Sequence, residues 1–122
     1  MIRHPLVATA ALALASLGLA APALAAPAAT PLAGTVGPGF TITLAKAGKK
    51  VTSLKAGSYA ITVTDKASVH NFHLLGPGVN KEITSVPYTG KKSVTVILKK
   101  GTYTYQCDPH ASGGMKGTFK VA

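Results

Sequence analysis

The stretch "YTYQCDPHASGGMKGTFKV", residues 103–121, contains a strand pattern, a short glycine-rich loop and a second strand pattern. Apolar and polar residues alternate in both flanking segments, which is typical of strands with one buried face. The loop between them holds the one cysteine of the chain, Cys107, followed by His110 and Met115. A thiol, an imidazole and a thioether therefore lie together between two predicted strands.

The same alternation runs through most of the chain after residue 33. Its segments are rich in Val, Ile, Thr, Phe and Tyr and are bounded by glycine, proline or Lys-Lys-Gly, with no clear helical period; they cover residues 40–44, 59–64, 70–74, 94–98, 103–107 and 119–121. This pattern predicts an all-β domain, a β-sandwich, with no second domain. We expect residues 93–98 and 102–107 to form a hairpin. The long connection over residues 75–92 is expected to hold an irregular edge strand or a turn of helix, because it contains several glycines and prolines.

Residues 1–25 have the three-part pattern of a secretory signal peptide. Arg3 and His4 precede an Ala/Leu-rich apolar run, and small residues follow at the positions where a signal peptidase cleaves. A membrane anchor is the alternative, but the run is short and alanine-rich compared with a span of ~20 strongly apolar residues. We therefore expect an exported protein, periplasmic or secreted, without a transmembrane segment in its mature form. Residues 26–33, rich in Ala and Pro, are expected to be an unstructured leader, and residues 34–122 the domain.

The chain is strongly basic, with a formal net charge of +10. Without Arg3, twelve lysines face three acidic residues. The lysines have two interpretations: they keep a monomeric protein soluble and protect its sheet edges, or they steer it toward a protein partner with an acidic surface or an anionic envelope. Nucleic acid is not an expected partner, because the predicted mature chain has neither arginine nor tryptophan.

Metal binding explains why the loop collects these side chains. Cys107 ends a predicted strand on its buried face, His110 follows three residues later, and the Gly-Gly pair lets the chain return with Met115. His70 lies at an inward position of another predicted strand. Two imidazoles, a thiolate and a weak thioether are the ligand set of a type 1, or blue, copper electron-transfer centre, and we expect one copper ion there.

Each of these residues also has a simpler interpretation. Taken alone, Cys107 is best read as a buried thiol, Met115 as a core residue and His110 as a loop histidine. Their spacing in one loop is what favours a metal site. Zinc prefers a carboxylate or water to a thioether, and a thiol hydrolase would need a third orienting group that is not evident. We therefore do not expect an enzyme.

The segment "CDPHASGGM" resembles the Cys-x-x-His-x-x-x-x-Met loop of plastocyanin, in the cupredoxin family. The pair His70-Asn71 resembles the His-Asn pair of that family, and "GTYTYQC" and "MKGTFKV" are similar to its flanking strands. The resemblance implies a Greek-key β-sandwich of about seven to eight strands and a blue-copper electron carrier. It implies His70, Cys107, His110 and Met115 as ligands, and Asn71 as the residue whose hydrogen bonds tie the two ligand-bearing segments together.

The sequence departs from the family at His73 and in its charge. Strand alternation places His73 on the face opposite His70, so it is expected to be a surface histidine unless a β-bulge reverses the alternation. With three acids in the chain, the acidic surface that plant plastocyanins present to their partner has no counterpart. In multicopper oxidases histidines flank the copper cysteine, whereas here its neighbours are Gln106 and Asp108.

Two functions are compatible with these ligands: electron transfer, and copper binding or delivery in the envelope. For electron transfer we expect His110 near the surface, within a ring of small or apolar residues where a partner docks. The expected ring consists of Gly37, Pro38, Gly76, Pro77, Ala111 and Gly113.

Overall fold

The computed structural model describes residues 10–22 and 27–122. Residues 10–22 contain neither helix nor strand, and the rest of the expected signal peptide, residues 1–9 and 23–25, lies outside the described residues. Among the residues described, no helix has the length and apolar character needed to span a bilayer. Over residues 27–122 the chain forms ten strands and one short 3₁₀ helix, η1.

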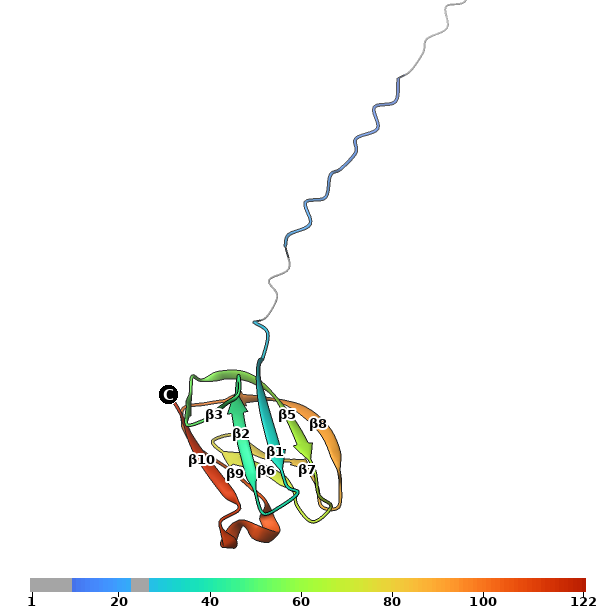
Figure 1. Cartoon of the computed structure of the whole chain (residues 1–122). Coiled ribbons are helices and arrows are strands. Elements are labelled where there is room, and N and C mark those ends of the chain that lie inside the picture. The colour runs from blue at the N-terminus through green and yellow to red at the C-terminus, as the bar shows by residue number, and fades with distance from the viewer. Residues whose placement is uncertain (1–9, 23–26) are drawn as a thin grey trace, which may run out of the picture.

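The strands form two five-stranded sheets that face each other (Figure 1). The first sheet has the order β3-β2-β1-β5-β8, and the second has the order β4-β10-β9-β6-β7. The prediction of a single-domain, all-β Greek-key sandwich is confirmed, although the strands number ten because β3 and β4 have two residues each. The bounds are β1 Thr30–Val36, β2 Ile42–Lys46, β3 Lys49–Lys50, β4 Ser53–Leu54, β5 Gly57–Asp65, β6 Phe72–Gly76, β7 Val79–Thr84, β8 Gly90–Leu98, β9 Gly101–Gln106, η1 Asp108–Gly113 and β10 Lys116–Val121.

Strand β1 begins at Thr30, inside the stretch expected to be an unstructured leader. Its residues pair in parallel with β5, from Thr30 opposite Tyr59 to Val36 opposite Asp65. Leu32, within that stretch, is buried in the core. The expected start of the domain at Gly34 is therefore wrong, because residues 30–33 supply backbone hydrogen bonds and an apolar side chain to the first sheet.

The hairpin expected between residues 93–98 and 102–107 does not form. Strand β8 pairs with β5 in the first sheet, whereas β9 pairs with β10 and β6 in the second. Residues 99 and 100 connect β8 of the first sheet to β9 of the second. The alternation of side chains shows which residues face the core, but strands of both sheets face the same core, so alternation cannot assign a strand to a sheet. The edge strand expected within residues 75–92 is present as β7.

Aromatic rings fill the space between the sheets. Phe72 stacks on Tyr105 with ring centroids 5.7 Å apart, and Tyr103 stacks on Phe119 at 5.4 Å. Gly34 of the facing sheet lets Phe72 approach closely: a β-carbon on Gly34 would lie 2.9 Å from the Phe72 ring. These rings bury large apolar areas and fix the distance between the two sheets.

Four connections meet at one end of the sandwich, which we call the loop end: residues 37–41, 66–71, 85–89 and 107–115. At the opposite end, the terminal end, β1 begins and β10 finishes (Figure 1). The sheet registers support this arrangement, since Val36 pairs with Ile42 and Asp65 with Gly90 near the loop end. Every residue singled out as a metal ligand lies in a connection of the loop end.

Candidate metal centre

Cys107 follows the last residue of β9, and its side chain is fully buried. Its backbone N–H donates to the carbonyl oxygen of Met115 at 3.0 Å, and its carbonyl accepts from the N–H of His110 at 3.1 Å. The 3₁₀ helix η1 starts immediately afterwards with Asp108 and Pro109. Cys107 is therefore held on both sides by the backbone of its own loop.

The loop returns to β10 through a left-handed residue. Gly114 has a φ of 96°, a conformation that favours glycine because it has no β-carbon. The N–H of Met115 then donates to the carbonyl oxygen of His110 at 3.2 Å, and the Met115 side chain is buried. The Gly-Gly pair thus performs the sharp turn that the sequence predicted and brings Met115 beside Cys107.

His70 reaches the site from the connection between β5 and β6. The sequence predicts His70 inside a strand, but in the structure it lies two residues before β6 begins. Asp65, at the end of β5, accepts a hydrogen bond from the N–H of Ala67 at 3.2 Å, and the N–H of His70 donates to the Ala67 carbonyl at 3.3 Å. This turn directs the His70 imidazole inward, where only 1% of the residue is exposed.

The side chains of His70, Cys107 and His110 converge on one point. The Nδ1 atoms of the two imidazoles lie 3.1 Å apart, and the Cys107 Sγ lies 3.6 Å from His70 Nδ1 and 3.3 Å from His110 Nδ1. Donor atoms bonded to one metal ion at about 2.0–2.3 Å are separated from each other by roughly 3–4 Å. The spacing and the soft sulfur and nitrogen donors fit one copper ion.

Asn71 joins the two connections that carry these side chains. Its Oδ1 accepts from the backbone N–H of Asp108 at 2.7 Å, and its Nδ2 donates to the Asp108 carboxylate at 2.9 Å. Asn71 itself is buried. The role that the family resemblance implied for Asn71 is therefore confirmed, and the residue after Cys107 is its partner.

His73 does not belong to the cluster, yet it is less exposed than expected of a surface histidine. A register irregularity lies between Phe72 and His73 in the pairing of β6 with β7. The His73 side chain is 18% exposed, and its Nδ1 lies 2.9 Å from Asp108 Oδ2. The expected separation of His73 from His70 holds, but no local pattern indicated an ion pair to a residue 35 positions away.

The pair also shifts the ionisation of both partners. Burial of the His73 imidazole opposes its charge, but hydrogen bonds to Asn80 and Asp108 and the charges of Asp108 and Glu82 outweigh this effect and raise the pKa of His73. Burial likewise disfavours the charge of Asp108, but hydrogen bonds from Gln106, Asn71 and His73 and the His73 charge lower the pKa of its carboxyl. Both shifts favour the charged pair.

Phe40 is a site residue that sequence reasoning missed. Phe40 is 74% exposed. Its ring nevertheless makes T-shaped contacts with the imidazoles of His70 and His110, with ring centroids 5.6 and 4.9 Å apart. Phe40 had been grouped with Ile42 and Leu44 as one strand, but β2 begins only at Ile42. The contact joins residues far apart in sequence, and no local pattern could have indicated it.

The surface around His110 differs from the expected ring. A small surface cavity beside His110 is lined by Phe40, Pro109, His110, Ser112, Gly113 and Met115. Gly76 and Pro77 do not contribute, because the Pro77 carbonyl accepts from the Tyr103 hydroxyl near the start of β9, whereas Cys107 follows the end of β9. Their place in the expected ring is wrong: they lie toward the terminal end, about 20 Å along the strand direction.

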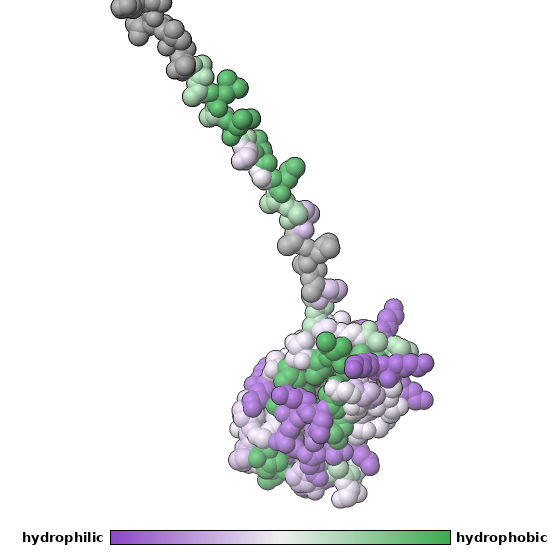
Figure 2. Space-filling view, turned by 180° about the vertical axis from the view of Figure 1, so that it is seen from behind, coloured by the Kyte–Doolittle hydropathy of each residue, from purple (hydrophilic) through white to green (hydrophobic). Residues whose placement is uncertain are grey.

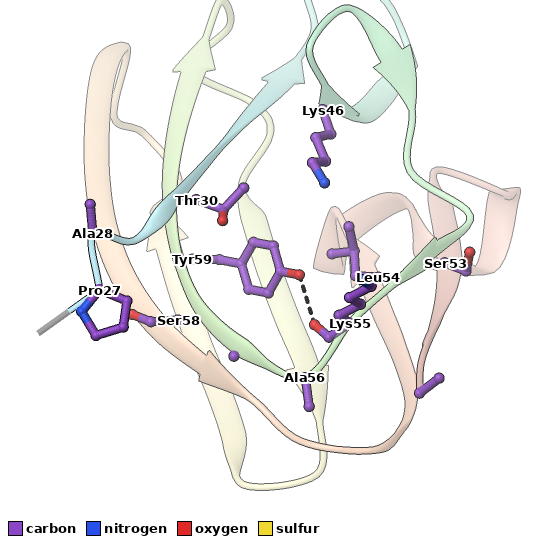
Figure 3. Close-up of a pocket in the computed structure, with 12 residues that line it drawn as sticks. Pro27, Ala28, Thr30, Lys46, Ser53, Leu54, Lys55, Ala56, Ser58 and Tyr59 are labelled. Atoms are coloured by element: carbon purple, nitrogen blue, oxygen red, sulfur yellow. Dashed lines mark hydrogen bonds between the residues drawn. The ribbon is translucent and has the colours of Figure 1, made fainter.

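A cavity of about 920 Å³ lies at the terminal end (Figure 3). It is lined by backbone and side chains that include Lys46, Lys55 and Tyr59, and the Tyr59 hydroxyl donates to the Lys55 carbonyl at 2.7 Å. None of the clustered sulfur and nitrogen donors borders this cavity. Cavity size therefore does not locate the chemistry of this protein.

Lysines are distributed over the whole domain, and hydrophilic side chains cover much of the face seen in Figure 2, with hydrophobic patches between them. Four lysines lie at or near the loop end. Lys91 and Lys92 pair with the last part of β5, Lys66 follows β5, and Lys116 follows Met115. Asp65 is buried there, and the Asp108 carboxylate is engaged by its neighbours, so the accessible charge at the loop end is mainly positive.

Comparison with known proteins agrees with this arrangement. Residues 40–122 match the family described as copper binding proteins, plastocyanin/azurin family. Plastocyanin A/B of Petroselinum crispum is 42% identical over 48 residues, which are 36% of this chain and 50% of that protein. The match therefore spans half the length of that relative.

Solved structures share the fold. Reduced auracyanin from Roseiflexus castenholzii superposes with a TM-score of 0.54 at 22% identity, over 79% of this chain and 99% of that chain. Rusticyanin from Thiobacillus ferrooxidans gives a TM-score of 0.50 at 26% identity, over 75% of this chain and 76% of that chain. The family match covers more than half of the sequence, including every residue of the cluster. The chain therefore belongs to the copper-binding plastocyanin/azurin family, the cupredoxins, and its cofactor is copper.

Proposed function

We propose that this protein is an electron carrier of the cell envelope or the secreted space, which cycles one type 1 copper between Cu(I) and Cu(II). The proposal assigns His70, Cys107, His110 and Met115 as the ligands. The observation that supports it most is the convergence of two imidazole nitrogens and one thiol sulfur, all within 4.8 Å, at the buried edge of a cupredoxin domain. A copper ion held by such donors exchanges a single electron.

The chain's own contribution is to hold the donors still. The loop bonds of Cys107 to Met115 and His110 hold the metal loop together, and the Asn71–Asp108 bonds join it to the connection that carries His70. Ligands fixed in this way keep nearly the same positions in both oxidation states. Little rearrangement then accompanies each transfer, which is the property that an electron carrier needs.

His110 offers the route to the surface. It is the partly exposed member of the cluster, while His70 and Cys107 are buried. Phe40 and Pro109 border it and give the surrounding surface an apolar character. We infer that a redox partner docks on this surface, so that the electron passes through the His110 imidazole.

The lysines of the loop end indicate the kind of partner. Lys66, Lys91, Lys92 and Lys116 surround a surface whose acidic groups are buried or already engaged. A positive field of this kind accelerates encounter with an acidic docking surface and slows encounter with a basic one. We propose a protein partner with an acidic docking surface, and a carrier that is monomeric between encounters.

We do not propose an enzymatic activity. The residues beside Cys107 are Gln106 and Asp108, and their side chains bond to each other at 2.9 Å. No histidine adjoins Cys107 in the sequence to pass electrons to a further metal cluster. Among the described residues, His70, Cys107 and His110 are the one group of three or more His, Cys, Asp or Glu side chains placed closely enough to hold a metal ion.

The test is the visible and EPR spectrum of the copper-loaded protein. We expect an intense blue band from thiolate-to-copper charge transfer, which bleaches on reduction and returns on oxidation. Cys107→Ser should abolish the band, and His70→Ala should lose it while the matched variant His73→Ala keeps it. A colourless Cu(II) protein with an ordinary tetragonal EPR spectrum would rule out the proposed site.

A second measurement separates electron transfer from copper delivery. The copper-loaded protein is mixed with excess chelator, and copper loss is compared with the rate of electron exchange. A carrier retains copper over many redox cycles. Rapid, complete loss of copper with slow electron exchange would favour a delivery protein that uses the same ligands.

A further inference from the structure

Asp108 is the most heavily hydrogen-bonded side chain at the loop end. Its carboxylate accepts from Asn71 Nδ2 at 2.9 Å, from Gln106 Nε2 at 2.9 Å and from His73 Nδ1 at 2.9 Å. Its backbone N–H donates to Asn71 Oδ1 at 2.7 Å. Because Asp108 directly follows Cys107 and begins η1, whatever fixes Asp108 also fixes the start of the metal loop.

His73 contacts this carboxylate from β6, a strand that does not carry any of the clustered donors. Its Nδ1 lies within 3.0 Å of both carboxylate oxygens, and its Nε2–H donates to Asn80 Oδ1 of β7 at 2.6 Å. Both ring nitrogens therefore face oxygen acceptors, which suits an imidazole that donates from both. The chain of contacts runs from β7 through His73 to the residue beside Cys107.

The pairing of β6 with β7 is irregular at the position from which His73 contacts Asp108. The register shifts between Phe72 and His73, so that Phe72 faces Thr84 while His73 faces Glu82. Bulges of this kind redirect a side chain next to a functional site. Here the shift accompanies a histidine that pairs with Gln106 of β9 in the sheet register and, like Gln106, bonds to the Asp108 carboxylate.

We propose that His73 is a positioning residue for the metal centre: through its hydrogen bond to Asp108 it fixes the loop that carries Cys107, His110 and Met115. It acts on the loop and is not itself a ligand. The inference rests on the proposed copper site for its relevance to function. The effect itself, the rigidity that the His73 side chain gives to the loop, is expected in the metal-free protein as well.

Two substitutions separate the two nitrogens of the ring. In His73→Asn the side-chain amide can occupy the position of Nδ1 and still donate to Asp108. In His73→Gln the amide reaches the position of Nε2, so the contact with Asn80 is retained and the one with Asp108 is lost. The two variants have similar polarity, so a difference between them reports the Asp108 contact itself.

The first experiment is amide hydrogen exchange of the metal-free protein, read at the loop amides of Cys107, Asp108 and Met115, with Ile61 of the first sheet as an internal reference. Loss of a hydrogen bond to a carboxylate should accelerate loop exchange roughly tenfold in His73→Gln. Exchange in His73→Asn should stay close to that of the parent. Ile61 should exchange at the same rate in all three proteins.

The second experiment uses the copper-loaded protein. Partners that orient metal ligands from outside the ligand set are typically worth 10–100-fold in metal affinity. We therefore expect His73→Gln to release copper to a chelator roughly tenfold faster, and its reduction potential to fall because the Asp108 carboxylate has lost a donor. His73→Asn should restore both properties toward those of the parent.

Equal exchange in the parent, His73→Gln and His73→Asn would overturn the proposal, and so would equal acceleration in both variants. If His73→Gln does not fold, His73→Ala takes its place, because it leaves the bonds of Asn71 and Gln106 to Asp108 intact. It must accelerate the same amides more than Asn80→Ala, which removes only the contact of His73 Nε2. Failure of this inference is distinguishable from failure of the copper site: the exchange experiment contains no metal, and the blue spectrum of the parent tests the ligand set rather than the rigidity of the loop.

Discussion

Replacing Asn71 by alanine should destabilise the metal-free protein far more than most polar substitutions of this domain. The change removes two hydrogen bonds that join the connections at the loop end, both to Asp108. The bond from the Asp108 N–H to the side-chain Oδ1 of Asn71 is worth about 1 kcal/mol. The bond to the Asp108 carboxylate contributes about 1.5 kcal/mol, at the low end for a charged acceptor because that side chain is 39% exposed.

The sum predicts a loss of about 2.5 kcal/mol in the free energy of unfolding. For a domain of this size each kcal/mol lowers the melting temperature by about 4–8 °C, so the midpoint should fall by roughly 10–20 °C. The assays are urea denaturation for the free energy of unfolding and thermal denaturation for the melting temperature, both on the metal-free protein and both followed by far-UV circular dichroism. Without metal, copper binding adds nothing to the stability of either protein.

Asn80→Ala is the matched control. Asn80 is exposed, and its side-chain oxygen contacts His73 alone among the side-chain bonds of the described residues. That variant should lose less than about 1 kcal/mol. If Asn71→Ala lowers the free energy of unfolding no more than Asn80→Ala does, then the Asn71–Asp108 bonds do not hold the loop, and they do not make the metal site rigid.

Three further outcomes are expected. Phe40→Ala should release copper to a chelator faster than the parent with little change in stability, because the ring covers both imidazoles but is itself exposed; unchanged release would mean that Phe40 does not shield the site. Electron exchange with an acidic partner should slow as salt rises, since charges are screened over ~10 Å at 0.1 M, and Lys91→Glu with Lys92→Glu should weaken this dependence; stopped-flow rates that are flat in salt would leave the lysines a role in solubility alone. The melting temperature of the metal-free parent should exceed that of His73→Phe most below pH 6.5 and lose this advantage as the pH rises through the raised pKa of His73; an advantage that grows with pH would contradict the ion pair.

Local sequence patterns were sufficient for the longer strands other than β1 and for most of the cluster. Alternation at period two located the buried face of β9, and the spacing of Cys107, His110 and Met115 indicated one loop with several donors. These features depend on residues close together in the chain. For the same reason the loop glycine at position 114 could be understood before its left-handed backbone was seen.

Contacts between distant residues could not be predicted in this way. Three features depend on how strands are placed relative to each other: the position of Phe40 over two imidazoles, the ion pair of His73 with Asp108, and the passage of residues 99–100 between the sheets. Pro77 shows the same limit: it was expected in the docking ring as a small or apolar residue, but the strand direction carries it to the terminal end. Periodicity determines which face of a strand is buried and leaves the neighbour of that strand open.

The location of both ends of the folded domain has a practical consequence. Pro27, Ala28 and Ala122 line the same cavity, at the end of the sandwich away from Cys107 (Figure 3). A thiol-bearing peptide, a linker or an affinity tag added at either end could therefore be used to attach the protein to an electrode. The loop end with its copper site would then face away from the electrode. Tandem copies, joined from the C-terminus of one to the first strand of the next, would need only a short spacer. Each copy would keep its loop end accessible to a soluble electron donor.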